Sequence, residues 1–184
     1  MELRTARLVL RRWRLSDTEP FSRLNADPIV MEHFPTILAR EQSDAFAESI
    51  EAEFEKRGHG LWAVEVQGQS EFIGYVGLRY HDFPAHFTPA VEIGWRLDRE
   101  QWGHGYATEA ARAALADGFT RLGLHEIVSF TVPANVRSRR VMQKLGMTHD
   151  PADDFDHPRL PEGHRLRRHV LYRLDSEDSG ELTS

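Results

Sequence analysis

The chain reads Glu100-Gln101-Trp102-Gly103-His104-Gly105-Tyr106-Ala107-Thr108-Glu109 and runs without a break into an alanine-rich stretch at residues 110–122. Apolar residues recur there at intervals of three and four, which predicts an amphipathic helix that ends at Gly123. The first backbone N–H groups of a helix have no partner within it and lie at the positive end of its dipole. Glycine at positions 103 and 105 lets an anion approach these amides. The segment therefore predicts a phosphate-binding loop at a helix N-terminus.

The composition is ordinary for a globular protein. The 184 residues suit one domain, with 40% hydrophobic and 28% charged residues. A formal net charge of -6 argues against a nucleic-acid partner and is expected to attract a cationic substrate. With no cysteine, the chain has no disulfide, thiolate metal site or cysteine nucleophile. Because the sequence shows neither an apolar signal core nor a membrane-length apolar run, we expect a cytoplasmic protein with no membrane partner.

The hydrophobic pattern predicts antiparallel hairpins followed by a strand-helix-strand unit around the glycine-rich loop. We expect strands at residues 6–12, 61–66, 72–80, 90–97, 126–132 and 169–174, and helices at residues 16–25, 41–56, 107–122 and 135–145. No repeat or linker interrupts residues 1–174, which we interpret as a single domain. Residues 175–184 are expected to be a disordered acidic tail.

A glycine-rich turn before a helix is also typical of dinucleotide-binding folds. Residues 103–108 approach the Gly-x-Gly-x-x-Gly pattern, and Glu126 follows about 20 residues later. However, Thr108 takes the place of the third glycine, and four predicted strands precede the loop instead of one. Too few strand-helix units follow to complete a doubly wound sheet, so the pattern disfavours that fold.

Three segments, in this order and spacing, resemble the GNAT superfamily of N-acetyltransferases: residues 91–97 (Val91-Glu92-Ile93-Gly94-Trp95-Arg96-Leu97), residues 101–110 and residues 135–147. Residues 5–11 and the Asn25-Ala26-Asp27-Pro28 turn resemble its Rim-type branch, which acetylates the N-termini of ribosomal proteins. The resemblance covers residues 4–174. It implies the α+β GNAT fold, in which about four helices flank a mixed, mostly antiparallel central sheet of six or seven strands, splayed at its centre.

The resemblance also implies acetyl-coenzyme A as co-substrate. The family places the pyrophosphate on the amides of the glycine loop and the pantetheine arm against the preceding strand. Trp102 departs from the superfamily pattern, which has Gln or Arg there, but the Rim-type branch tolerates this because backbone amides do the binding. The expected coenzyme-binding residues are Trp95, Arg96, Leu97, Trp102, Gly103, His104, Gly105, Tyr106, Ala107, Thr108, Asn135 and Arg140.

Two residues of the predicted helix at 135–145 have alternative roles. Asn135 is either a simple N-cap or, as in the family, also a contact of the pantetheine arm. Arg140, or its neighbour Arg139, is either part of a solvated basic stripe or a partner of the 3′-phosphate of the coenzyme.

Acetyl transfer to an amine requires a base, a polarised thioester carbonyl and a proton for the leaving thiolate. Glu92 is the candidate base, directly or through water, because its two neighbours on the strand point to the opposite face. Ser138 resembles the helix serine that serves as acid in the Rim type, and Tyr172 on the last strand is its rival. Backbone N–H groups near Trp95 are candidates for holding the carbonyl oxygen. Alternatively, Glu92 and Ser138 are ordinary solvent-facing side chains.

The acceptor is inferred from amine chemistry. An α-amine titrates near 7.7 to 8.0 and a lysine near 10.4, so freeing the lysine costs about 3.5 kcal/mol more at neutral pH. A single glutamate therefore suits a protein N-terminal α-amine. A small amine such as a polyamine or an aminoglycoside remains an alternative, as does a non-catalytic module that only binds coenzyme A.

The family places its first helices over the acceptor cleft, so the expected acceptor-binding residues are Trp13, His33, Phe34 and Trp62. The ten histidines show no spacing typical of a metal site, and no metal is expected. The protein is expected to be a monomer or a homodimer.

Overall fold

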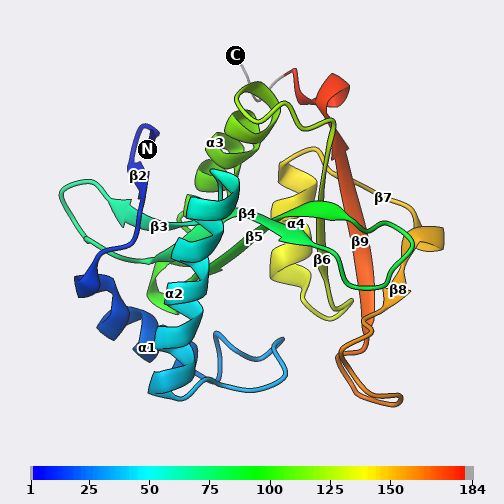
Figure 1. Ribbon diagram of the computed structural model, residues 1–184, viewed down its shortest axis with the longest axis horizontal. Helices are drawn as coiled ribbons and strands as arrows, with labels where there is room; N and C mark the ends of the chain where they lie inside the picture. The colour runs from blue at the N-terminus through cyan, green and yellow to red at the C-terminus, as the bar shows by residue number, and fades with distance from the viewer. Residues whose placement is uncertain (1, 181–184) are drawn as a thin grey trace.

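The computed structural model describes residues 2–180, which are built around one sheet of nine strands (Figure 1). The strand order is β1-β2-β3-β4-β5-β6-β9-β7, with β8 paired to β9. The six longer strands are β2 (Leu8–Arg11), β3 (Leu61–Val66), β4 (Gly74–His81), β5 (Ala90–Leu97), β6 (Glu126–Thr131) and β9 (Arg168–Asp175). Two-residue strands, too short to produce a sequence period, are β1 (Leu3–Arg4), β7 (Thr148–His149) and β8 (Phe155–Asp156). The predicted GNAT architecture is confirmed, and these short strands account for the larger number.

Four α-helices flank the sheet within the described residues: α1 (Thr18–Ala26), α2 (Arg40–Arg57), α3 (Tyr106–Thr120) and α4 (Val136–Lys144). Figure 1 shows α2 crossing in front of the strands, and Phe46 from this helix packs on Tyr75 of β4 with ring centroids 6.0 Å apart. The opposite face of β4 meets α3, where Leu78 crowds against Gly118. Since side chains alternate along a strand, Tyr75 and Arg79 share the α2 face, whereas Leu78 belongs to the α3 face.

The sheet opens at its centre, between β5 and β6. Strands β2 to β5 pair antiparallel in sequence order, but β5 and β6 run parallel and share a single register pair, Glu92 with Val128. Close to this point, the Ser129 hydroxyl donates a hydrogen bond to the Ile93 carbonyl at 2.9 Å. The two strands then diverge (Figure 1), which leaves residues 94–97 of β5 without a β6 partner.

Regular secondary structure continues beyond residue 174, the predicted end of the domain. Asp175 closes β9 opposite Glu126, and Ser176–Ser179 form a 3-10 helix. The Ser176 amide donates to the His125 carbonyl at 2.8 Å. The predicted disordered tail therefore does not begin at residue 175, and residues 181–184 of that prediction lie outside the described part. Among the helices of residues 2–180, none has both the length and the apolar character needed to cross a bilayer.

Candidate active site

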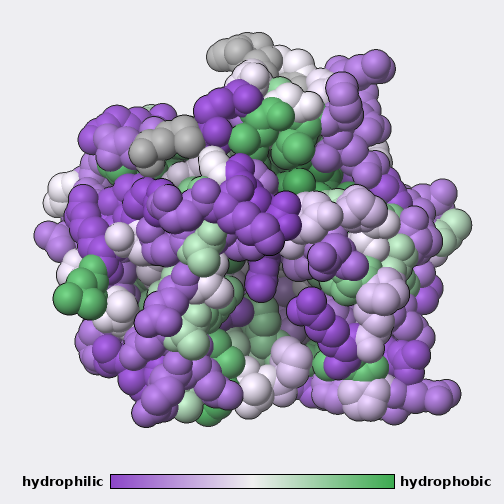
Figure 2. Space-filling model, viewed as in Figure 1, coloured by the Kyte–Doolittle hydropathy of each residue, from purple (hydrophilic) through white to green (hydrophobic). Residues whose placement is uncertain are grey.

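A cavity of about 960 Å³ lies where β5 and β6 diverge. Figure 2 shows a recess on this face, between the side of the molecule that carries α2 and the side that carries β6 and β9. Its walls come from β4 and β5, from the glycine loop and the first turn of α3, from α4, and from the irregular segments at residues 29–38 and 157–166. One cavity thus contains both the predicted phosphate-binding loop and the predicted base.

The glycine loop has the backbone conformation that the sequence suggested. Gly105 is the N-cap of α3, and both it and Gly103 have φ near +83°, a region that favours glycine. A Cβ on Gly105 would meet nothing closer than Arg7 Nη2 at 3.6 Å, so the backbone angle, more than crowding, requires glycine. Trp102 Nε1 donates to the Leu97 carbonyl at 2.9 Å and joins the loop to the end of β5.

The structure brings most of the predicted coenzyme residues to this cavity. The ones that line it are Trp95, Arg96, Leu97, Trp102, Gly103, Gly105, Tyr106, Ala107, Thr108, Asn135 and Arg140. His104 does not line it, because its side chain turns outward and stacks on Tyr106 with centroids 5.5 Å apart.

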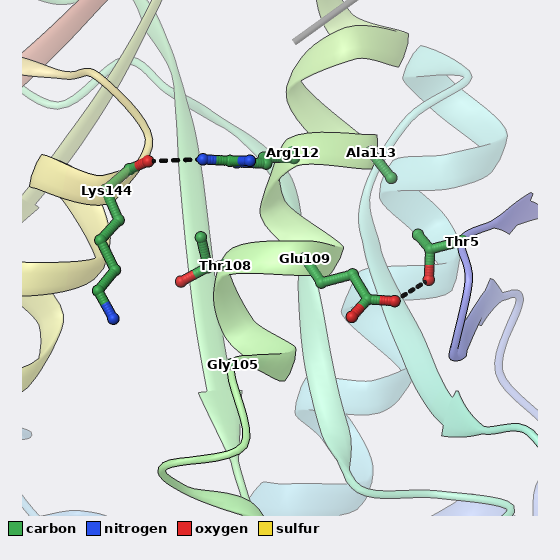
Figure 3. Close-up of a pocket in the computed structure, with 7 residues that line it drawn as sticks. All are labelled: Thr5, Gly105, Thr108, Glu109, Arg112, Ala113 and Lys144. Atoms are coloured by element: carbon green, nitrogen blue, oxygen red, sulfur yellow. Dashed lines mark hydrogen bonds between the residues drawn. The ribbon is translucent and has the colours of Figure 1, made fainter. Parts of the chain in front are cut away.

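A second hollow of about 810 Å³ extends from the same loop between α3 and α4 (Figure 3). The Lys144 side chain points toward the first turn of α3, where Thr108 lies, and Arg112 donates to the Lys144 carbonyl at 3.1 Å. The hollow is lined by Thr5, Gly105, Thr108, Glu109, Arg112, Ala113 and Lys144. It adds two cationic side chains, Arg112 and Lys144, beside the predicted phosphate-binding loop.

Glu109 lies in this hollow but its charge is compensated. Thr5 Oγ1 donates to its carboxylate at 2.6 Å and Arg7 Nε at 2.7 Å. Burial raises the pKa of Glu109, but the hydrogen bonds from Thr5 and Arg7 outweigh burial and leave the pKa below its ordinary value. The bonds also fasten residues 5–7 to the start of α3.

The structure bears on the alternative roles of Asn135 and of Arg140 at the start of α4 and within it. Asn135 caps the helix, since its Oδ1 accepts from the Ser138 amide at 3.2 Å, and its Nδ2 donates to Thr131 Oγ1 at 3.0 Å. Arg140 lines the cavity. Its rival Arg139 does not, because its guanidinium is directed to the Pro133 carbonyl at 3.2 Å.

Glu92 is held in a defined position at the bottom of the cavity. Its side chain is only 17% exposed, so it is not an ordinary solvent-facing glutamate. Oε2 lies 2.7 Å from His81 Nε2 on β4. Oε1 lies 3.9 Å from the point that a Cβ on Gly94 would occupy, which places it beside the open strip over that glycine. One carboxylate oxygen is therefore anchored, and the other faces space that a substrate can fill.

The two candidate acids differ in position. Ser138 lines the cavity together with Glu92. Tyr172 does not, because alternation along β9 turns it away from the face of His169, which does line the cavity. Tyr172 is 2% exposed and stacks on His149 with centroids 5.0 Å apart. Ser138 therefore shares the cavity with Glu92, and Tyr172 does not.

Only two of the four predicted acceptor residues reach the cavity. His33 and Phe34 line it. Trp62 is fully buried and does not line the cavity, because its ring packs on Phe54 of α2 with centroids 5.4 Å apart. Trp13 packs on Phe21 and donates Nε1 to the Leu61 carbonyl at 2.7 Å. Trp13 and Trp62 are therefore core residues, and their assignment to the acceptor cleft is corrected.

Sequence reasoning missed an aromatic wall around Glu92, formed by His81, Phe130, His157 and His169. The His81 and Phe130 rings lie 5.3 Å apart, and those of His157 and His169 lie 5.2 Å apart. Burial, with positive neighbours that include His169, lowers the pKa of His157 to about 4. Burial also lowers the pKa of His169. At neutral pH, His157 and His169 therefore present uncharged rings to the cavity.

The cavity is cationic, although the chain is not. Its lining has one carboxylate, Glu92, and six cationic side chains: Arg79, Arg96, Arg137, Arg140, Lys144 and Arg159. Of these six, only Arg137 has a carboxylate within 4.0 Å in residues 2–180, at 3.4 Å from Glu32. The expectation that a negative net charge would favour a cationic substrate is thus wrong for the site itself. Across the described chain, no group of three or more acidic or histidine side chains is arranged to hold a metal ion.

Comparison with known proteins agrees with this geometry. A family model described as an acetyltransferase (GNAT) domain matches residues 7–148. YnaD of Bacillus subtilis (strain 168), an uncharacterized N-acetyltransferase, is 28% identical over 179 residues, which make up 97% of this chain and 99% of YnaD.

Two solved structures are similar over nearly the whole chain. A GNAT-family acetyltransferase from Bacillus anthracis has a TM-score of 0.79 and 27% identity, covering 96% of this chain and 99% of its own. RimL, a ribosomal L7/L12 alpha-N-protein acetyltransferase in complex with coenzyme A, has a TM-score of 0.77 and 14% identity, covering 97% and 99%. At this identity, RimL supports the fold alone.

Proposed function

This chain belongs to the acetyltransferase (GNAT) family and is an acetyl-coenzyme A-dependent N-acetyltransferase, and we propose that its acceptor is a protein N-terminal α-amine that Glu92 deprotonates. One observation carries the proposal: the anchored carboxylate of Glu92 lies in the same cavity as the glycine loop and Ser138. A base, an anion-binding loop and a hydroxyl are the groups that acetyl transfer needs.

The residues present fit the coenzyme. The amides at the start of α3 suit a pyrophosphate, and Arg140 and Lys144 line the same cavity with no carboxylate partner in residues 2–180. The backbone of residues 95–97 lacks a β6 neighbour and suits the amide groups of a pantetheine arm. When bound, the coenzyme supplies the acetyl group as a reactive thioester.

Glu92 is the proton acceptor in this proposal. His81 holds Oε2, so Oε1 over Gly94 takes the proton from the ammonium of the acceptor, directly or through one water. The neutral aromatic wall of His157, His169 and Phe130 limits the water around this carboxylate. The amine is then free to attack a carbonyl held near the opening between β5 and β6.

Two further groups serve the carbonyl and the leaving thiolate. The amide of Trp95 lies on the unpaired stretch of β5 and is the candidate donor to the carbonyl oxygen. The hydroxyl of Ser138 lines the cavity and is the candidate acid, since Tyr172 is turned away from it.

A protein α-amine fits the site better than a polyamine or an aminoglycoside. One glutamate suits an α-amine, whose pKa of about 7.7 to 8.0 leaves a far larger neutral fraction near pH 7 than the pKa of about 10.4 of a lysine. Arg79, Arg96 and Arg159 line the cavity with no carboxylate within 4.0 Å in residues 2–180, and they disfavour a substrate that carries several positive charges. The resemblance of residues 5–11 and 25–28 to the Rim-type branch also favours a protein α-amine as acceptor.

The test compares two peptides of one sequence with acetyl-coenzyme A, read by thiol release. One has a free N-terminus and no lysine, and the other has a blocked N-terminus and one lysine. We expect faster turnover of the first. Faster turnover of the lysine peptide would remove the preference for α-amines, and absence of release with any amine would remove the proposed chemistry.

A further inference from the structure

We propose that the acceptor amine carries a carboxylate, which Arg96 and Arg79 recognise on the α2 face of the sheet. The inference rests on the proposed function and adds the chemical class of the acceptor. The carboxylate belongs either to an acidic side chain near a protein N-terminus or to a small amino acid, and the experiment below separates these two sources.

Arg96 is a buried cation without an anion. It is only 7% exposed, and no carboxylate lies within 4.0 Å of its guanidinium in residues 2–180. The groups that it contacts directly are neutral: Nη1 donates to Asn25 Oδ1, and the guanidinium lies 4.0 Å from the ring centroid of Phe34. Nε is buried with no hydrogen-bond partner. A buried charge without a counter-ion is costly, so a site of this kind is completed by an anionic group.

Arg79 adds a second unpaired cation on the same face. In the β4–β5 register it lies opposite Glu92, and Tyr75 lies opposite Arg96. The Arg79 and Arg96 guanidiniums lie 5.5 and 5.8 Å from the ring centroid of Phe46. The two arginines therefore lie near the same aromatic ring, and both line the cavity.

Gly94 leaves a path between the base and these arginines. Glu92, Gly94 and Arg96 point to the same face because they alternate along β5. A Cβ on Gly94 would meet nothing nearer than the Glu92 carboxyl group at 3.9 Å, so the strip between Glu92 and Arg96 is open. Arg96 lies four positions from Glu92 along β5, about 13 Å of strand, whereas Arg79 lies directly opposite Glu92, so the two arginines suit carboxylates at different distances from the amine.

The alternative is that Arg96 only anchors the segment at residues 27–38 through Asn25 and Phe34. Such a role would affect stability and all acceptors alike. Recognition of a carboxylate instead changes the ratio between acceptors that differ in charge alone. Selectivity between matched acceptors is therefore the readout that separates the two roles.

The experiment uses two matched pairs of acceptors. One pair is a peptide with a free α-amine and glutamate at its second and third positions, and the same peptide with glutamine there. The other pair is free glutamate and glutamine amide, which has an α-amine but no carboxylate. Affinity is measured by calorimetry with coenzyme A present, and kcat/KM is measured by thiol release. The variants are Arg79→Gln and Arg96→Gln, and Arg23→Gln on the exposed side of α1 is the control.

We expect the acidic member of one pair to bind at least about tenfold more tightly, and the pair that shows this difference identifies the source. The difference should shrink in Arg79→Gln and Arg96→Gln and persist in Arg23→Gln. Arg79→Gln carries the test if Arg96→Gln does not fold, because Arg79 is exposed. Equal affinities, tighter binding of the neutral member, no binding of either pair, or a difference that survives in Arg79→Gln would each overturn the proposal.

Measuring binding by calorimetry, independently of turnover, allows recognition of the carboxylate to be tested separately from the proposed acetyl transfer. Selective binding of the acidic acceptor without thiol release would support recognition of the carboxylate and contradict the chemistry. Thiol release with no dependence on acceptor charge would support the chemistry and contradict the recognition.

Discussion

His81 Nε2 lies 2.7 Å from Glu92 Oε2, and the two residues come from neighbouring antiparallel strands, β4 and β5. Both side chains are largely buried, at 12% and 17% exposure. Among residues 2–180, Glu92 is the only carboxylate that lines the cavity, and the contact fixes one of its oxygens and leaves the other free. The position of the proposed base is thus set by the pairing of two strands and does not depend on a mobile loop.

Replacing the base tests this assignment directly. Glu92→Gln keeps the shape of the side chain but cannot accept the proton of the amine, so kcat should fall by about 100-fold or more. Coenzyme affinity, measured by calorimetry, should stay unchanged because the carboxylate is not part of the glycine loop. Glu41→Gln on the exposed side of α2 is the control. Unchanged turnover in Glu92→Gln would exclude this residue as the base.

Removing the partner of the base should have a smaller effect. His81→Phe keeps a ring against Phe83 and Phe130, whose centroids both lie 5.3 Å from that of His81, but it frees Glu92 Oε2. Because a misplaced base is less effective, we expect kcat to fall by about tenfold with little change in coenzyme affinity. A loss as large as that of Glu92→Gln would instead indicate that His81 itself transfers the proton.

The glycine loop can be tested with a matched pair of glycines. Gly105 and Gly58 both have positive φ, +83° and +71°, at a helix N-cap and a helix C-cap. Alanine at either position should lower the free energy of unfolding by about 1 kcal/mol, because both require a left-handed backbone. Only Gly105→Ala should also weaken coenzyme A binding, by about tenfold. Equal coenzyme affinity in both variants would argue against a role for the loop amides.

The role of Arg140 predicts a dependence on one phosphate group. Arg140→Gln should weaken binding of coenzyme A by about tenfold and leave binding of dephospho-coenzyme A nearly unchanged. Arg139→Gln is the control, since Arg139 is directed to the Pro133 carbonyl and away from the cavity. Calorimetry with both ligands checks this. A similar loss for the two ligands would assign Arg140 to another part of the coenzyme.

The partly buried His157 predicts that the free energy of unfolding decreases as the pH is lowered. Burial lowers the pKa of His157 from 6.5 to about 4, so the unfolded chain binds this proton more readily than the folded one. The free energy of unfolding should therefore decrease between about pH 6.5 and about pH 4, by about 1 to 3 kcal/mol for this group. Urea denaturation at several pH values should show a smaller decrease for His157→Gln. An identical slope in the variant would contradict this origin.

Local sequence patterns predicted most of the fold. Alternation placed β3 and β5 at the residues observed, and the three- and four-residue period of residues 110–122 gave α3 to within a few residues. The glycine loop at residues 103–105 and Glu92 on its strand could be proposed as site residues because both depend on residues close in sequence, and their roles stay predictions. The resemblance to the GNAT superfamily then supplied the mixed, mostly antiparallel sheet and the opening at its centre.

Contacts between distant segments could not be predicted. The link between His81 and Glu92 depends on the register of β4 with β5, and a shift of one residue would move His81 to the other face. His157 comes from an irregular segment that has no period to interpret. Trp13 and Trp62 were misassigned because an aromatic residue in the core and one in a cleft look alike in sequence. The net charge led to the expectation of a cationic substrate for a similar reason. A sum over 184 residues does not show where arginines without a carboxylate partner lie in the folded protein.

The fastening of residues 5–7 to the first turn of α3 has a practical consequence for anyone who prepares this protein. Thr5 and Arg7 hold Glu109, and the Arg7 guanidinium lies 4.7 Å from the ring centroid of Tyr106. Removing the residues before β2, or fusing an affinity tag directly to them, would weaken these contacts with the start of α3. The proposed coenzyme-binding loop would then be less well held, although every residue of the loop would still be present. An affinity tag should therefore be placed at the C-terminus or separated from the N-terminus by a long spacer. If a protein without residues 5–7 binds coenzyme weakly, the loss of these contacts is the first cause to test.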